Sequence, residues 1–416
     1  MQEERTNVPK IRFKGYAEEW EERKFESLLD KKDGIRRGPF GSALKKEFFV
    51  SESEYVVYEQ QNAIYDNYET RYNITKEKFE ELSKFELKPT DFIMSGAGTI
   101  GRISKVPNGI NKGVFNQALI RFRINKSITD SEYFVQFVRA DFMQRKLTGA
   151  NSGSAITNLV PMSEVKNWII KVPKINEQQK IGSFFKQLDD TITLHQRKLD
   201  LLKQIKQSYL QKMFPKKGED KPEIRFAGFT DAWEQRKLAS MTNYKNGKGH
   251  EDKQSTIGKL ELINLNSISI SGGLKHSGKF IDEADDTLQK DDLVMILSDV
   301  GHGDLLGRVA LIPEDDRFVL NQRVALLRPN ATADPQFLFS YINAHQYYFK
   351  AQGAGMSQLN ISKGSVENFI SFVPIIEEQK KIGTFFKQLD DTIALHQREL
   401  DSLKEMKKSL LQQMFV

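Results

Sequence analysis

The sequence contains no cysteine, which excludes disulfide bonds and thiolate metal sites and is typical of a reducing compartment. No apolar stretch approaches the roughly 18 residues that a helix needs to cross a bilayer. The start, MQEERTNVPK, lacks the apolar core of a signal peptide. We therefore expect a cytoplasmic protein with no membrane partner.

Motifs for catalysis and cofactor binding are also missing. The six histidines are dispersed and show no metal-ligand spacing, and no nucleophile motif stands out. Gly258-Lys259 is followed by leucine and lacks the preceding glycine of a Walker loop. The stretch SGAGTIGR (95–102) formally satisfies G-x-G-x-x-G, but no helix clearly opens behind it, so we interpret it as a tight turn. We predict no catalytic residue, no metal site and no cofactor in this chain.

What remains is an ordinary globular composition with a basic bias. The 416 residues suffice for two to four domains, with 39% apolar and 28% charged residues. The net charge of +6 mildly favours polyanionic partners.

The chain repeats itself. Residues 177–214 and 378–415 are identical at all but ten of their 38 positions. A second pair of segments, PKIRFKGYAEEWEERKF (9–25) and PEIRFAGFTDAWEQRKL (222–238), precedes them. The sequence between these pairs shares only scattered residues. We predict two similar halves, each a variable globular unit followed by a near-identical helix.

Each long repeat carries a heptad seam of apolar residues and contains no proline, as expected for a coiled coil about 55 Å long. The predicted seam is Ile181, Phe185, Leu188, Ile192, His195, Leu199 and Leu202 in the first copy, and Ile382, Phe386, Leu389, Ile393, His396, Leu400 and Leu403 in the second. Lys206 and Lys407 interrupt it further on.

We expect the two helices to form an antiparallel coiled coil that relates the halves by a pseudo-two-fold axis. His195 and His396 lie at the midpoints, so they should face each other and fix the register. A metal or catalytic role is the alternative, although no acidic cluster lies at ligand spacing. The paired aspartates Asp189–Asp190 and Asp390–Asp391 lie beside the seam, and we interpret them as a solvated face.

Each globular unit shows strand-like runs separated by glycine-rich turns, which predicts an α/β (α+β) fold. Strands are expected at 54–64, 91–94, 102–106, 118–124, 260–264, 293–297, 308–312 and 323–328, with one helix per unit at 131–147 and 334–351. The predicted parts are an N-terminal domain 1–173, a helix 174–214, a linker 215–222, a C-terminal domain 223–374 and a helix 375–416.

Loop composition indicates a nucleic-acid ligand. Cations neutralise phosphates, glycine amides allow close approach, and Asn, Gln and Arg side chains hydrogen-bond base edges. The candidates are Arg36, Arg37, Ser42, Lys45, Lys46, Asn151, Ser152 and Ser154 in the first half, and Lys245, Lys248, His250, Ser357, Gln358 and Asn360 in the second. Solvated loops are the alternative interpretation. Asn116-Gln117 and Asn321-Gln322 are more typical of backbone caps.

The whole chain resembles the specificity subunit of Type I restriction–modification systems. The resemblance rests on the EQ-K-IG-FFKQLDDTI-LHQR-L helices, the W-E-RK segments, and the GPFGS and GTIGR turns. It implies two target recognition domains for double-stranded DNA, held apart by helices that act as ruler and docking surface. Unlike domains should recognise a bipartite, asymmetric site.

The resemblance further implies a non-catalytic subunit of a larger complex. Two modification subunits would hold S-adenosylmethionine and methylate adenine, and restriction subunits would use ATP and Mg²⁺. Two alternatives remain open: a recognition subunit of a Type IIB-like system, and a coiled-coil adaptor that binds proteins only.

Overall fold

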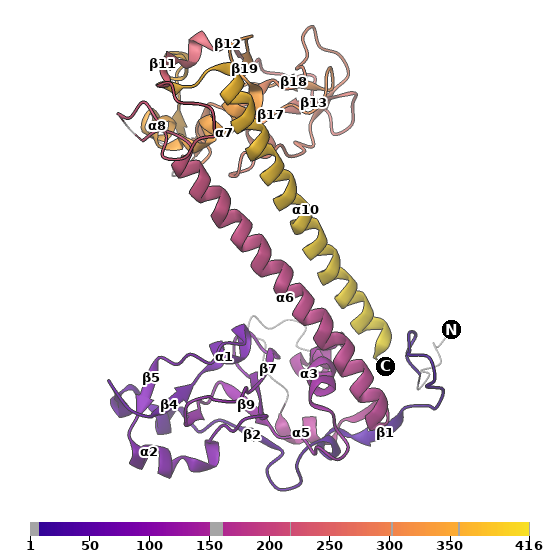
Figure 1. Cartoon of the computed structure of the whole chain (residues 1–416). Helices are drawn as coiled ribbons and strands as arrows, with labels where there is room; N and C mark the ends of the chain where they lie inside the picture. The colour runs from indigo at the N-terminus through magenta and orange to yellow at the C-terminus, as the bar shows by residue number, and fades with distance from the viewer. Residues whose placement is uncertain (1–7, 150–160, 217, 301–302, 357, 416) are drawn as a thin grey trace. The chain divides into compact units, whose positions relative to one another are not determined.

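The computed structural model describes residues 8–149, 161–216, 218–300, 303–356 and 358–415 (Figure 1). The chain divides into two units: unit 1 comprises residues 1–195 and 399–416, and unit 2 comprises residues 196–398. Both boundaries fall inside long helices. Each unit therefore contains one globular domain together with a part of each long helix.

The two copies of the long repeat form the helices α6 (Ile175–Lys212) and α10 (Ile376–Met414) (Figure 1). Each helix begins two residues after a proline, Pro173 or Pro374, that follows a short strand. Glu177 and Glu378 lie in the first turns, where a carboxylate interacts favourably with the helix dipole. Among the described residues, no helix combines the length and apolarity needed to cross a bilayer.

Within each unit the two helix segments run in opposite directions. In unit 1 the ring centroids of Phe185 and Phe415 lie 6.1 Å apart, while Asp189, one turn further along α6, pairs with the earlier residue Lys407 of α10. In unit 2 the rings of Phe214 and Phe386 stack at 5.8 Å, and Lys206 pairs with Asp390. The predicted antiparallel coiled coil is confirmed.

The lysines that interrupt the seam are partners of the aspartates beside it. Lys407 Nζ lies 2.5 Å from Asp189 Oδ1, and Lys206 Nζ lies 2.5 Å from Asp390 Oδ1. Burial lowers the pKa of Lys407, although the Asp189 carboxylate acts to raise it. The interpretation of Asp189 and Asp390 as solvated residues is wrong, because their cationic partners come from the other repeat, about 200 residues away in the chain.

The predicted seam residues are buried or half-buried. The most buried of them, at 8% exposure or less, are Ile181, Phe185, Leu188, Leu199, Ile382, Phe386 and Leu400. The half-buried ones are Ile192, His195, Leu202, Leu389, Ile393, His396 and Leu403. His195 belongs to unit 1 and His396 to unit 2, so their predicted pairing stays a prediction.

A buried ion pair connects the segment at the start of each half, 9–25 or 222–238, to the start of the long helix of the same half. These two stretches are called the leading segments. Arg12 donates to both oxygens of Glu177 at 2.6 and 2.7 Å, and the Glu177 side chain is only 2% exposed. Arg225 makes the same bidentate contact with Glu378 at 2.9 and 2.7 Å. The hydrogen bond to the carboxylate raises the pKa of each arginine, as expected for a charge-assisted pair.

Directly after this glutamate, each repeat contains a Gln-x-x-x-Gly motif. It contacts the start of a domain helix, which follows Asp130 in unit 1 and Asp334 in unit 2. Gln178 Oε1 accepts from the Asp130 amide at 3.0 Å, and Gln379 Oε1 accepts from the Asp334 amide at 3.0 Å. A Cβ on Gly182 would lie 2.5 Å from the Tyr133 amide nitrogen, so only glycine permits this approach. The identical residues of the repeats thus serve domain contacts as well as the coil.

The unit 1 domain contains a four-stranded antiparallel sheet of order β2-β9-β6-β7 and a second sheet of order β3-β5-β4-β8, in which β4 and β8 are parallel. Strand β1 pairs with β10. The strands are β1 (Glu21–Lys24), β2 (Ile35–Arg37), β3 (Phe49–Val50), β4 (Tyr55–Tyr58), β5 (Tyr72–Ile74), β6 (Phe92–Ser95), β7 (Ile103–Lys105), β8 (Gly113–Phe115), β9 (Leu119–Phe122) and β10 (Ile169–Val172). The helices are α1 (Gln60–Tyr65), α2 (Lys76–Glu81), α3 (Ser131–Arg139), α4 (Asp141–Thr148) and α5 (Met162–Asn167).

The unit 2 domain repeats this plan with sheets β12-β19-β15-β17 and β14-β13-β18 and the pair β11–β21, and it also contains the pair β16–β20. Its strands are β11 (Glu234–Lys237), β12 (Thr242–Asn246), β13 (Leu260–Ile263), β14 (Phe280–Ile281), β15 (Leu293–Ile296), β16 (Ser298–Val300), β17 (Val309–Leu311), β18 (Phe318–Leu320), β19 (Val324–Pro329), β20 (Gln358–Asn360) and β21 (Ile370–Val373). Its helices are α7 (Pro335–Ala344), α8 (Gln346–Ala351) and α9 (Lys363–Glu367).

These elements confirm the predicted mixed α/β fold and correct two predictions. The run 54–64 is a strand only as far as Tyr58, because Glu59 and Asn62 form a capping box that starts α1. Each single helix expected at 131–147 and 334–351 is a pair, α3–α4 and α7–α8. The chain is extended at Ala140, and Gln144 donates to the Val138 carbonyl left unpaired at the end of α3.

The core of each domain is completed by a phenylalanine that lies just beyond the end of a long helix. Phe415 contacts the rings of Trp20, Tyr133, Phe137 and Phe185, and all five residues are buried. In unit 2, Phe214 makes the equivalent contacts with Trp233, Phe337, Tyr341 and Phe386. The coil and the domains therefore share one hydrophobic core in each unit.

Phe415→Ala should destabilise the unit 1 domain by about 3 kcal/mol or more, because it leaves an aromatic-sized cavity in the core. Hydrogen exchange should accelerate in β6 and β9 and remain unchanged in β15 and β19. Leu194→Ala, at an exposed position of α6 in the same unit, is the matched control and should have little effect. Equal acceleration in both units would contradict the separate cores.

Asp189→Ala should lower the free energy of unfolding by about 2 kcal/mol, because it leaves the half-buried Lys407 ammonium without its carboxylate. Asp190→Ala is the control: Asp190 is exposed and its pair with Lys186 links successive turns, so the loss should stay below about 0.5 kcal/mol. The exchanged pair Asp189→Lys with Lys407→Asp should recover part of the loss. Denaturant unfolding measures all three, and equal effects of the two single variants would refute a register role.

Candidate nucleic-acid interface

The two domains carry equivalent loops held by the same backbone contact. A Cβ on Gly38, after β2, would lie 1.9 Å from the Asn116 carbonyl oxygen. A Cβ on Gly247, after β12, would lie 1.8 Å from the Asn321 carbonyl oxygen. No side chain fits at such distances, so both loops require glycine at this point. The contact defines the equivalence of Gly38 and Gly247.

The asparagines of this contact act as backbone caps, as the sequence indicates. Asn116 Oδ1 accepts from the Ala118 amide at 3.1 Å, and Asn321 Oδ1 accepts from the Gln322 amide at 2.9 Å. The SGAGTIGR stretch is the tight turn between β6 and β7: Gly98 and Gly101 have φ of 62° and 82°, which favours glycine.

In unit 1 most of the described candidates point into solvent. Arg37, Ser42, Lys45 and Lys46 are exposed around the Gly38 loop. Arg36 differs, because its Nη2 donates to Asp33 Oδ1 at 2.7 Å and both groups are partly buried. Arg36 thus contributes to the base of the loop, and the other four remain predicted DNA contacts.

Asp33 is the centre of a partly buried charge cluster that connects β2 to β9. Arg121, whose side chain is 1% exposed, lies 2.5 Å from Asp33, and Arg123 pairs with both Asp33 and Asp91. Burial acts to raise the pKa of Asp33, but hydrogen bonds from Arg36 and Arg121 bring it below its ordinary value. A carboxylate with these partners stays ionised and holds the loop base rigid.

Unit 2 keeps part of this cluster. Arg328 donates to both oxygens of Asp292 at 2.7 Å, in the place of Arg123 and Asp91. The strand register puts Leu326 where unit 1 has Arg121. The two domains share the loop frame, which is the backbone contact between the glycine and the asparagine. The side chains that support this frame differ between the domains.

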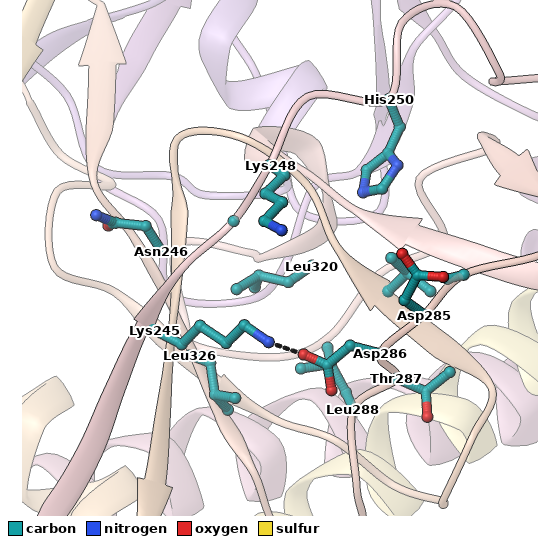
Figure 2. Close-up of a pocket in the computed structure, with 13 residues that line it drawn as sticks. Lys245, Asn246, Lys248, His250, Asp285, Asp286, Thr287, Leu288, Leu320 and Leu326 are labelled. Atoms are coloured by element: carbon teal, nitrogen blue, oxygen red, sulfur yellow. Dashed lines mark hydrogen bonds and ion pairs between the residues drawn. The ribbon is translucent and has the colours of Figure 1, made fainter.

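The unit 2 loop borders a pocket of about 90 Å³ (Figure 2). Lys245, Lys248 and His250 line one side, and Asp285 and Asp286 line the other. Figure 2 shows the Lys245 ammonium directed at Asp286, with which it forms an ion pair. Both partners of this pair are about half exposed, so solvent screens the interaction and a phosphate could replace the carboxylate at little cost.

The remaining candidates belong to the last part of each domain's sequence. Asn151, Ser152, Ser154 and Ser357 fall outside the described residues. Gln358 and Asn360 lie on β20, where Asn360 Oδ1 accepts from Ser298 Oγ at 2.5 Å. The exposed Asn360 side chain therefore already forms a hydrogen bond within its own domain, whereas the Gln358 side chain is half-buried.

The structure adds two residues that the candidate set lacks. Phe40 in the GPFGS turn is 90% exposed, and Gln117 lies beside Gly41 of the same turn. Both line a surface hollow of about 980 Å³ together with Arg37 and Lys84. The GPFGS sequence predicts the turn. It does not predict that Phe40 is exposed, because an aromatic residue is ordinarily assigned to a core.

The chain contains two similar domains whose loops share a backbone anchor but carry different side chains. Its two long helices form an antiparallel coiled coil. Together these features define a recognition scaffold. The chain belongs to the family described as the Type I restriction modification DNA specificity domain, whose profile matches residues 17–204 and again 230–405. It serves as a DNA-recognition subunit of a type I restriction–modification system, which is a non-catalytic role. The expectation of a DNA-recognition subunit is confirmed.

Two relatives come from Methanocaldococcus jannaschii. The type I restriction enzyme MjaVIII specificity subunit is 22% identical over 72% of this chain and 73% of its own length. The putative type I restriction enzyme MjaX specificity subunit is 22% identical over 80% of this chain and 79% of its own.

Solved structures share the fold at low identity. The S subunit of a type I restriction–modification system from M. genitalium has a TM-score of 0.63 and 16% identity, covering 98% of this chain and 99% of its own. A chain from a structure on complex assembly and conformational transition of the type I system has a TM-score of 0.55 and 15% identity, with 94% and 96% coverage.

The double variant Lys45→Ala/Lys46→Ala should weaken binding to duplex DNA and reduce the slope of log affinity against log salt by about one unit for each lysine that contacts a phosphate. The control Lys10→Ala/Lys14→Ala removes the same charge from the leading segment that packs on α6 and should leave the slope unchanged. Binding titrations between about 50 and 200 mM salt measure both slopes. Equal reductions would show that only net charge matters.

Proposed function

We propose that each globular domain recognises one half of a bipartite, asymmetric DNA site and that α6 and α10 set the number of base pairs between the halves. The observation that carries this proposal is the pair of equivalent loops anchored at Gly38 and Gly247. Their frames match, but unit 1 continues with Pro39-Phe40 and unit 2 with Lys248-Gly249. Matching frames with different side chains suit recognition of two different sequences.

The proposed boundaries follow the sequence prediction: domains at 1–173 and 223–374, helices at 174–214 and 375–416, and a linker at 215–222. Both helices pass from one unit into the other, which supports a spacer role. A duplex rises about 34 Å per turn, so helices of about 55 Å can hold two readers about one turn apart.

The proposed partners are double-stranded DNA, two modification subunits and the restriction subunits. The modification subunits would hold S-adenosylmethionine and methylate adenine, and the restriction subunits would use ATP and Mg²⁺. Membership of the specificity family supports an assembly of this kind in the cytoplasm. Exposed helix positions outside the seam, such as Leu194, Leu201 and Leu395, are apolar surface that a docked subunit could cover.

Replacing residues 26–172 by the corresponding domain of another specificity subunit should change one half-site and leave the other half and the spacer unaltered, because the second domain and both helices are kept. Mapping of N6-methyladenine in DNA from cells that contain the chain and its modification subunits gives both half-sites.

The reciprocal exchange of residues 239–373 is the matched control and should change only the other half-site. A change in both halves after either exchange would contradict independent recognition. No methylation in cells that express all subunits would contradict the proposed partners.

A further inference from the structure

The Phe40 side chain is exposed to solvent, so it contributes little to the stability of the fold. Its side chain is 90% exposed, although its neighbour Pro39 is buried. Burying a phenylalanine stabilises a protein by about 1.5–3 kcal/mol, a gain that this position forgoes. An exposed aromatic residue on a DNA-recognition loop suggests a contact with the ligand.

Hydrogen bonds hold the backbone on both sides of Phe40 in a defined position. The Gly38 amide donates to the Leu119 carbonyl at 3.0 Å, and the Ala43 amide donates to the Phe40 carbonyl at 2.8 Å. On the other side, a Cβ on Gly41 would lie 2.8 Å from the Gln117 side chain. The backbone of Phe40 is therefore held at the start of the short helix η2 (Gly41–Leu44).

The residues around Phe40 carry groups that can contact DNA. The hollow that it borders also contains Arg37 and Lys84, which can neutralise phosphates, and Gln117, which can hydrogen-bond a base. In the major groove the apolar group at a base edge is the C5-methyl of thymine, and phenylalanine is one of the residues that contact it.

Unit 2 has no aromatic residue at the equivalent position. Counting from the equivalent glycines Gly38 and Gly247, the position of Phe40 is occupied by Gly249. The two loops otherwise share their anchor, so the aromatic ring distinguishes what the first domain can recognise from what the second can.

We propose that Phe40 is a specificity-determining residue that packs its ring against the C5-methyl group of a thymine in the half-site of the first domain. This rests on the proposed function, in which residues 1–173 recognise one half of the site. The ring supplies an apolar surface that favours thymine over cytosine at one position, while Arg37 and Gln117 supply polar contacts nearby.

The test removes the methyl group and the ring in combination. Each thymine of the first half-site is replaced singly by deoxyuridine, and affinity is measured for the full chain with its modification subunits. The wild-type chain should lose about fourfold at one thymine, the loss expected for one methyl group. Phe40→Ala should bind the thymine duplex more weakly and show no further loss with deoxyuridine, whereas Phe40→Leu should keep part of the discrimination.

Tyr65→Ala is the matched control, since Tyr65 is 76% exposed in the same unit and does not border the hollow. It should retain the fourfold difference. Unchanged deoxyuridine sensitivity in Phe40→Ala, or a wild-type chain indifferent to every thymine of that half-site, would overturn the proposal. Failure of half-site recognition itself would appear separately, as a domain exchange that leaves the methylated sequence unaltered.

Discussion

The rest of the structure depends on the register of the two antiparallel helices, and two ion pairs set this register. Lys407 and Lys206 occupy seam positions where a hydrophobic residue would be expected, and each reaches an aspartate on the opposing helix. Sliding one helix by a turn would leave a half-buried ammonium against aliphatic side chains. Apolar seams tolerate many registers, whereas an unpaired buried charge is strongly disfavoured.

The register in turn places the ends of the helices in the domains. With Asp189 opposite Lys407, Phe415 falls among Trp20, Tyr133 and Phe185. Three of the identical residues at the start of each repeat make separate domain contacts. The glutamate holds the leading arginine, the glutamine holds the loop before α3 or α7, and the glycine admits that helix. The repeats are therefore nearly identical because they must satisfy the coil and the domain at once.

The antiparallel pairing is expected from the pseudo-two-fold relation between the halves, since apolar spacing alone does not set the direction of a helix pair. Sequence periodicity could predict the long helices and most central strands, because these depend on the local spacing of apolar residues. It failed where a distant residue decides the outcome. Asp189 looks like a solvated charge until Lys407 is brought beside it. The run 54–64 continues a strand pattern until the capping box of Glu59 and Asn62 starts a helix. Phe40 is an apolar residue that would ordinarily be assigned to a core, and only the folded chain shows that its ring is exposed to solvent.

The loops show how a common frame can carry different specificities. The approach of Gly38 to Asn116 and of Gly247 to Asn321 involves only backbone, so it places no demand on the residues that follow. Behind this anchor, unit 1 has a buried cluster around Arg121, while unit 2 has Leu326 at that place and keeps only the Arg328–Asp292 pair. Beyond the anchor, Phe40 in unit 1 and Lys248 in unit 2 are exposed, so their replacement disturbs neither the sheet nor the coil. Because the anchors are backbone contacts and the register is fixed elsewhere, a change of loop side chains can alter the proposed contacts with DNA while the anchors and the helix register are kept.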